Sequence, residues 1–155
     1  MSGWPRRLVL AVPLSVPVAS RAAAQATAAA TSPAESFEAA SRAILGGRVP
    51  LETGVLLDIP PVSENGNSVE LSVKVESPTT PEDHVTAIHI LSEKNPYPRV
   101  AAFTLTPRAG RAEVATRIRL STSQVVLVLA ETSRGVVHRA SREVIVVLGA
   151  CVDGG

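Results

Sequence analysis

The chain has 155 residues, nearly equal numbers of basic and acidic side chains, and a formal net charge of +1. A charge this close to zero gives no basis for binding nucleic acid or an anionic membrane, since both require a clustered cationic surface. Hydrophobic residues make up 45% of the chain but aromatic ones only 3%. A core would therefore be packed mainly from Val, Leu and Ile, which suits β-sheets.

Residues 1–26 have the layout of a cleaved secretory signal peptide. The basic pair Arg6-Arg7 precedes an apolar run from Leu8 to Val18, and small residues follow at 20–26. The pair is twin-arginine-like, although it lacks the usual Ser before it and Phe after it. The apolar run is shorter than the roughly 20 residues that span a bilayer, and two prolines interrupt it. We therefore expect export to the periplasm, with no membrane anchor after signal removal.

Cleavage of this signal changes the charge of the chain. A cut after Ala24 or after Ala26 satisfies the small-x-small rule, and both cuts remove three arginines and no acid. The 15 basic residues then become 12 against 14 acidic ones, so the net charge changes from +1 to −2. About 129 residues remain, enough for one domain with a real core.

Residues 27–48 are predicted to form a linker and a short amphipathic helix. Ser32 is expected to be the N-cap, with Pro33 at the first helical position and Glu35 returning a hydrogen bond to the cap. The pair Gly46-Gly47 is expected to end the helix. Apolar residues at spacings of three and four share one face, namely Phe37, Ala40 and Ile44.

Residues 49–148 are predicted to form an all-β domain. Apolar and polar residues alternate from Val69 to Glu76, which indicates a strand with one buried face. The seven predicted strands are 55–59, 69–75, 85–91, 100–105, 113–120, 125–131 and 143–148. No helical stretch of ten residues separates any two of them, so we expect no parallel crossovers. The pattern predicts an antiparallel β-sandwich of immunoglobulin-like plan.

Candidate catalytic or metal-binding residues are few. His84 and His89 are five residues apart in a strand region and are expected on opposite faces, while His138 is expected in a later turn. The carboxylates expected in turns or on the surface are Asp58, Glu64, Glu82 and Asp83. The chain also lacks the patterns of a phosphate-binding glycine loop and a serine nucleophile elbow. We expect a protein without cofactor or metal that is not itself an enzyme.

Cys151 is the only cysteine and lies near the end of the chain. Structural cysteines in an oxidising compartment come in pairs, so a single one indicates intermolecular pairing or a reactive thiol. Small and glycine-rich residues surround it: Gly149, Ala150, Val152, Asp153, Gly154 and Gly155. Such a segment does not pack a core. Residues 149–155 are therefore predicted to be a flexible C-terminal arm that, when extended, holds the sulfur on the order of 10 Å beyond Leu148. A frayed terminus with an incidental cysteine remains an alternative.

Several segments, in this order and spacing, are shared with a known family. They are Pro60-Pro61-Val62-Ser63-Glu64-Asn65-Gly66-Asn67-Ser68-Val69, Glu93-Lys94-Asn95-Pro96-Tyr97-Pro98, Thr116-Arg117-Ile118-Arg119-Leu120, Ser123-Gln124 and Gly149-x-Cys151. With them the chain resembles the SoxY family, the sulfur-carrier subunits of the SoxYZ complex in bacterial thiosulfate oxidation.

The resemblance implies a non-catalytic periplasmic carrier that forms a heterodimer with a SoxZ-like subunit and holds sulfur intermediates on Cys151. It also implies two enzymes that act on the arm. A haem-containing enzyme joins thiosulfate to the cysteine sulfur, and a manganese-containing hydrolase releases the terminal sulfonate as sulfate.

The end of the chain departs from the family pattern Gly-Gly-Cys-Gly-Gly. Ala150 replaces the second glycine, and Val152-Asp153 is inserted before the final glycine pair. Ala and Val restrict the backbone more than glycine does, and Asp153 disfavours a thiolate through like charge. Two other hypotheses stay open: a sandwich adaptor whose cysteine only forms an intermolecular disulfide, and an enzyme with a thiol nucleophile.

Overall fold

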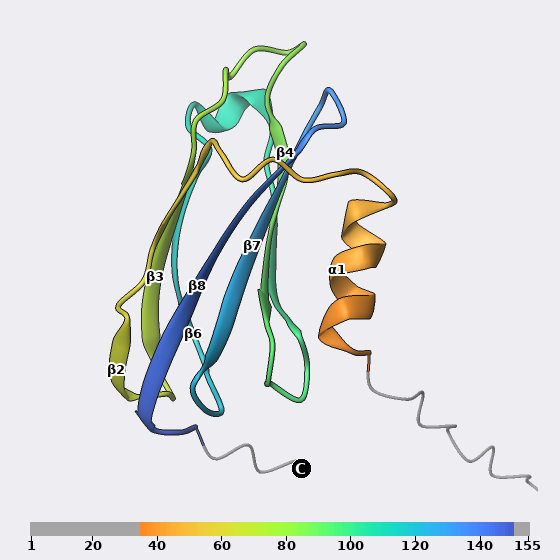
Figure 1. The fold of residues 1–155 in the computed structure, drawn as a ribbon. Coiled ribbons are helices and arrows are strands. Elements are labelled where there is room, and N and C mark those ends of the chain that lie inside the picture. The colour runs from red at the N-terminus through yellow and green to blue at the C-terminus, as the bar shows by residue number, and fades with distance from the viewer. Residues whose placement is uncertain (1–34, 151–155) are drawn as a thin grey trace, which may run out of the picture. The chain divides into compact units, whose positions relative to one another are not determined.

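The computed structural model describes residues 35–150 (Figure 1). The predicted signal peptide, the start of the linker and residues 151–155 lie outside this part of the chain. Within it, one α-helix, eight strands and a short 3-10 helix follow one another. None of its helices is long and apolar enough to cross a membrane.

Helix α1 (Phe37–Leu45) has the predicted apolar face but a different N-terminus. Its N-cap is Ser36, whose Oγ accepts a hydrogen bond from the Ala39 N–H at 3.1 Å. The predicted start at Ser32 and Pro33 is therefore wrong. Glu35, which was expected to serve that cap, forms an ion pair with Arg99 instead. The C-terminus is as predicted, because Gly46 adopts a φ of 57° and its N–H donates to the Arg42 carbonyl.

Two sheets form the sandwich. The strands are β1 (Val55–Asp58), β2 (Val62–Asn65), β3 (Val69–Val75), β4 (Val85–Ser92), β5 (Arg99–Thr104), β6 (Glu113–Ile118), β7 (Gln124–Thr132) and β8 (Val137–Leu148), with the 3-10 helix η1 (Pro107–Ala109) between β5 and β6. The three-stranded sheet has the order β1-β3-β6, and the five-stranded sheet has the order β2-β8-β7-β4-β5. The predicted β-sandwich fold is confirmed.

Two strands differ from the prediction. Strand β2 was not predicted, and β8 begins at Val137 rather than near Glu143, so His138 lies in a strand and not in a turn. The β2–β8 pair is parallel, which corrects the expectation of purely antiparallel pairing. A parallel pair needs a long connection, and here most of the domain supplies it, so no crossover helix is required.

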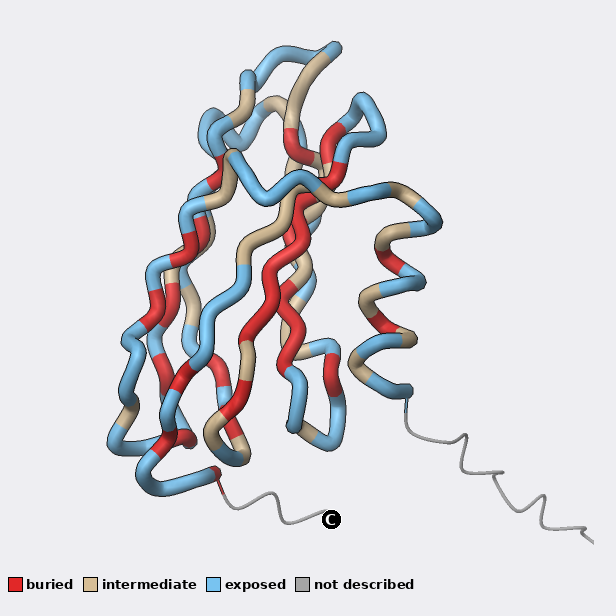
Figure 2. The backbone as a smooth tube through the Cα atoms, in the orientation of Figure 1, coloured by how far each residue is buried: buried red, intermediate tan, exposed pale blue. Residues whose placement is uncertain are grey.

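The main core lies between the two sheets, as the red segments of Figure 2 show. Strand β3 has the predicted alternation, with Val69, Leu71, Val73 and Val75 all buried. Helix α1 covers the other face of the five-stranded sheet, where Ala40 and Ile44 pack in a second apolar cluster. The sheet residues of that cluster are Leu91, Leu127, Leu129 and Val137. The five-stranded sheet is therefore covered on one face by the other sheet and, over β4, β7 and the start of β8, on the opposite face by α1.

A charged group fastens the C-terminal end of α1 to this sheet. The Arg48 guanidinium donates to the carbonyls of Ile44 and Leu45 and, at 2.5 Å, to Oε2 of Glu131 in β7. The other carboxylate oxygen of Glu131 lies 2.9 Å from Nε2 of His89. Burial alone would raise the pKa of Glu131, but the hydrogen bonds from Arg48 and His89 outweigh it and hold that pKa below its ordinary value.

Candidate functional site at the C-terminal end of β8

The described chain ends at one end of the sandwich, where β8 passes into Gly149 and Ala150 (Figure 1). Of the predicted arm, only these two residues are described. Cys151, the predicted attachment point, lies outside the described residues together with Val152, Asp153, Gly154 and Gly155. The covalent role of Cys151 therefore stays a prediction, and the observable site is the surface from which the arm leaves.

A closed ring of three backbone hydrogen bonds holds the end of β8. The Gly66 N–H donates to the Leu148 carbonyl at 2.8 Å, and the Leu120 N–H donates to the Gly66 carbonyl at 2.8 Å. The Ala150 N–H closes the ring by donating to the Leu120 carbonyl at 3.0 Å. Each of the three segments thus donates to one neighbour and accepts from the other. Ala150 is only 7% exposed.

Two glycines make this close approach possible. A Cβ on Gly66 would lie 2.2 Å from the Leu120 carbonyl oxygen and 2.9 Å from the Ala150 nitrogen. A Cβ on Gly149 would lie 2.2 Å from the Ser121 carbonyl oxygen. Neither glycine has a positive φ, so the requirement for glycine here is lack of space and not backbone conformation.

The buried side-chain amide of Gln124 supports the loops that form the ring. Gln124 is 2% exposed, and its Oε1 accepts hydrogen bonds from the Ser92 hydroxyl at 2.9 Å and the Lys94 N–H at 2.7 Å. Its Nε2 donates to Oδ1 of Asn95 at 2.9 Å and to the Thr122 carbonyl at 3.1 Å. All four hydrogen-bonding positions of the amide are used, so Gln124 joins the β4–β5 loop to the β6–β7 loop.

Asn95 continues the connection between the two loops. Its Nδ2 donates to the Arg119 carbonyl at 2.8 Å, and its Oδ1 also accepts from the Ser121 N–H at 3.0 Å. The Ser121 hydroxyl donates back to the Lys94 carbonyl at 3.1 Å. These bonds fix the 119–123 segment, and that segment supplies the carbonyls against which Ala150 and Gly149 pack.

The segments quoted for the family resemblance therefore meet around one point. The turn at Gly66, the loop at Asn95 and the pair Ser123-Gln124 all contact each other or the end of β8, and the Ser123 hydroxyl accepts from the Val146 N–H at 2.9 Å. The sequence predicts turns at Glu64–Asn67 and Asn95–Pro98 and a strand through Thr116–Leu120, but not the contacts between these segments. The contacts between them join residues that are distant in the chain, so no local sequence pattern could predict these contacts.

The histidines lie in separate environments. His84 Nδ1 is 3.1 Å from the Thr80 carbonyl, His138 Nδ1 is 2.7 Å from the Thr53 carbonyl, and His89 contacts Glu131. In the part of the chain that the structure describes, no three His, Cys, Asp or Glu side chains gather as a metal site would require.

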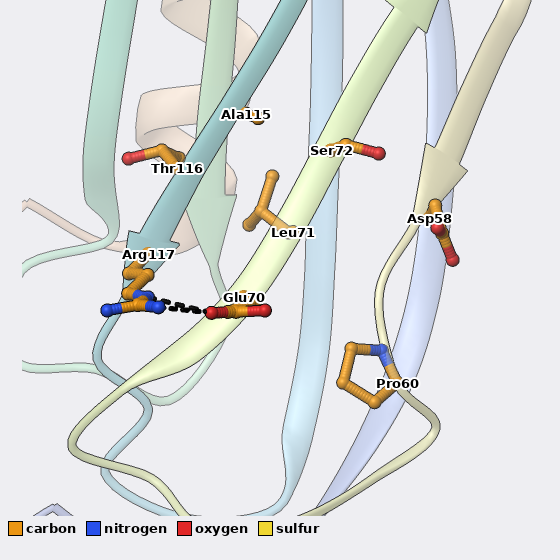
Figure 3. Close-up of a pocket in the computed structure, with 8 residues that line it drawn as sticks. All are labelled: Asp58, Pro60, Glu70, Leu71, Ser72, Ala115, Thr116 and Arg117. Atoms are coloured by element: carbon orange, nitrogen blue, oxygen red, sulfur yellow. Dashed lines mark hydrogen bonds and ion pairs between the residues drawn. The ribbon is translucent and has the colours of Figure 1, made fainter.

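A depression of about 610 Å³ lies on the outer face of the three-stranded sheet (Figure 3). The small side chains of Ser72 and Ala115 line it, between Asp58 on one side and the Glu70–Arg117 ion pair on the other. Both partners of that pair are about 70% exposed (71% and 69%). The depression contains no histidine and no cysteine, and we assign it no chemistry.

Comparison with known proteins identifies relatives. A family model described as sulfur oxidation protein SoxY matches residues 41–151. The structure of the sulfur carrier protein SoxY from Chlorobium limicola f thiosulfatophilum is 30% identical, with a TM-score of 0.57 over 71% of this chain and 94% of that one. No curated protein matches the chain.

Other solved structures share the fold alone. A superoxide reductase (neelaredoxin) from Ignicoccus hospitalis, the E23A variant, is 17% identical, with a TM-score of 0.55 over 70% of this chain and 86% of that one. A putative superoxide reductase from Thermotoga maritima is 18% identical, with a TM-score of 0.53 over 61% and 86%. Identities this low support the sandwich architecture and say nothing about activity.

Proposed function

Because this chain belongs to the SoxY family of sulfur oxidation proteins, we propose that it is a periplasmic carrier that holds thiosulfate-derived intermediates covalently on Cys151. The observation that carries the proposal is the extent of the family match, which runs to residue 151, the single cysteine of the chain. The hydrogen-bonded end of β8 supports it, since Cys151 follows Ala150 directly in the chain.

Loading joins the outer sulfur of thiosulfate to the sulfur of Cys151. A new S–S bond forms as the thiol loses its proton and the two sulfurs together lose two electrons. A haem-containing enzyme takes up these electrons. A manganese-containing hydrolase then adds water at the terminal sulfonate and releases sulfate, which leaves a persulfide on the cysteine.

The residues around the end of β8 suit a carrier that relies on its partner enzymes to activate the cysteine thiol. Two charged side chains lie at the neighbouring loops: Lys94, whose ammonium donates to the Ser123 carbonyl at 3.2 Å, and Glu93, whose carboxylate lies 3.5 Å from the Val125 nitrogen. The other side chains that hydrogen-bond there, among the described residues, are amides and hydroxyls, those of Asn95, Ser121, Ser123 and Gln124. None of these amides and hydroxyls is a general base near neutral pH. We expect the partner enzyme to supply both the base that removes the thiol proton and the electron acceptor.

A SoxZ-like partner subunit is supported by an exposed apolar strip at the edge of the five-stranded sheet. Val62 in β2 pairs with Ile145 in β8, so both side chains lie on the same face, and Val147 follows two residues later. All three are more than half exposed, at 51%, 52% and 64%. Edge strands with apolar side chains are normally covered or blunted. A heterodimer partner would cover this strip.

Intact-mass measurement of the purified mature chain tests the proposal. The chain is incubated under non-reducing conditions with thiosulfate and the haem-containing enzyme, and separately without either. We expect a mass increase that corresponds to a thiosulfonate adduct only in the complete mixture. Cys151→Ser is the matched control, because it removes only the nucleophile and is expected to show no adduct.

Two outcomes would contradict the carrier role. If Cys151 is found only in a disulfide with another protein, the chain is an adaptor. If the isolated chain turns over a sulfur compound and Cys151→Ser abolishes that turnover, the chain is an enzyme with a thiol nucleophile.

A further inference from the structure

We propose that the outer face of the three-stranded sheet binds the same face of a second copy of this chain. The observation that carries the proposal is a self-complementary arrangement of charges on that face. The face belongs to β1, β3 and β6, whereas the exposed apolar strip proposed to bind a SoxZ-like subunit belongs to β2 and β8. The proposal therefore does not rest on the proposed function.

The outward side chains of β3 and β6 form three rows across the sheet. Buried residues of β3 alternate with exposed or half-buried ones, so every second side chain points outward. The register between the two strands pairs these outward residues as Glu70–Arg117, Ser72–Ala115 and Lys74–Glu113. The two outer rows are therefore charge pairs of opposite order, and the middle row between them is small and neutral.

A two-fold axis along the middle row matches the charges of two copies. A half-turn about this axis turns the face over and exchanges the two outer rows, so β3 of one copy lies over β3 of the other. Lys74 then faces Glu70 of the second copy, and Glu113 faces Arg117 of the second copy. Each contact occurs twice by symmetry. A half-turn about β3 would instead set Lys74 against Lys74, so the charge pattern selects one orientation.

The face is open to such a partner. Helix α1 packs on the other sheet, and the Glu70 and Arg117 side chains are 71% and 69% exposed. Ser72 and Ala115 line the depression between the charged rows (Figure 3). Two sheets pack face to face about 10 Å apart, and the depression leaves room for the long charged side chains of the second copy.

The size of the face makes this dimer weak. Three strands about 4.8 Å apart and three rows about 6.8 Å apart cover less than the roughly 800 Å² per partner of a stable interface. Asp58 lies in the middle row beside Ser72, so it meets its own copy near the axis. Arg111 and Arg119 lie beyond the outer rows, where sheet twist separates the copies. We expect a Kd on the order of 0.1 mM, so the dilute chain is monomeric and its face is solvated.

Sedimentation of charge-reversed variants tests the proposal. All chains carry Cys151→Ser, which removes the only cysteine, and are measured at low salt from about 0.02 to about 1 mM. We expect this parent chain to dimerise, and to do so about tenfold more weakly in about 0.5 M salt. Lys74→Glu sets acid against acid and Glu70→Lys sets base against base. Each variant alone should therefore dimerise at least about tenfold more weakly.

A mixture of the two variants gives the sharpest result. In a mixed pair the acid at position 74 of one chain faces the base at position 70 of the other, and the original contact remains on the opposite side of the axis. We expect this heterodimer to be at least as tight as the parent dimer, a rescue that a folding defect could not produce. Asp58→Asn should tighten the parent dimer about threefold, because it removes a like-charge contact.

Glu143→Lys is the matched control, because it reverses an exposed charge on β8 of the other sheet. It should leave the Kd of the dimer unchanged. A parent chain that stays monomeric at about 1 mM would overturn the proposal. The same holds for a mixture as dissociated as its components, or for an equal weakening by Glu143→Lys.

Discussion

Helix α1 and the end of β8 are fastened to the same sandwich by different forces. Helix α1 packs an apolar face on the five-stranded sheet and is held at its C-terminal end by Arg48, Glu131 and His89. The end of β8 is held by a ring of backbone hydrogen bonds, supported by the neutral amides of Asn95 and Gln124.

The difference has a functional consequence. An attachment made by ion pairs weakens with salt and with titration of its partners, whereas backbone and amide hydrogen bonds between neutral groups do not titrate. We therefore expect the end of β8 to keep its position over a wide pH range. Such constancy would suit the carrier role proposed above.

The largest loss of folding stability is expected from Gln124→Leu. This change keeps the size of the side chain but leaves the buried Ser92 hydroxyl and the Lys94 N–H without their partner. We expect a loss of about 3 kcal/mol in the free energy of unfolding, measured in urea. Asn67→Ala, at an exposed position of the neighbouring turn, should change it by less than about 0.5 kcal/mol. Equal stabilities of the two variants would show that the amide network does not support the loops.

A smaller, pH-dependent effect is expected from Glu131→Gln. The folded-state pKa of Glu131 is lowered from 4.5, so its carboxylate contributes stability above that pH and loses it as the pH falls through the folded-state pKa. The variant should be about 1 kcal/mol less stable than the wild type at pH 7. The gap should shrink steadily below pH 4.5. Urea unfolding over this pH range measures it.

The same titration applied to the other attachment sharpens the comparison. The stability difference between the wild type and Gln124→Leu should stay constant over that range, because none of the amide's hydrogen-bond partners titrates there. If the stability difference from the wild type shrinks at low pH for both variants, the two attachments do not differ in their dependence on charge.

The smallest effect is expected from Arg117→Ala. The Glu70–Arg117 pair joins β3 and β6 on an open face, and both side chains are mostly exposed. We expect a loss of at most about 0.5 kcal/mol at low salt, which added salt should screen further. The stability loss of this variant gives the contribution of an exposed ion pair, with which the loss in Glu131→Gln can be compared. A loss as large as that of Gln124→Leu would contradict the view that this sheet face is solvated.

Local periodicity explains which elements the sequence could predict. The apolar face of α1 and the alternation in β3 are set by neighbouring residues, and both were predicted correctly. The predicted cap at Ser32 was wrong: Ser36 caps the helix, and Glu35, expected to serve the cap, pairs with Arg99 far along the chain. No local pattern shows that long-range contact. Strand β2 is almost entirely exposed, and the first half of β8 shows no alternation in burial. Neither pattern signals a strand until the partner strand is known.

The sequence by itself determined the β-sandwich class, the apolar helix face and the family, because periodicity and ordered motifs are properties of the chain. Only the tertiary structure decided how the end of β8 is held. The ring at Gly66, Leu120 and Ala150 consists of backbone hydrogen bonds between three distant segments, and backbone groups are the same at every residue. The one trace that it leaves in the sequence is the absence of a side chain at Gly66 and Gly149, where the chains approach too closely for a Cβ atom.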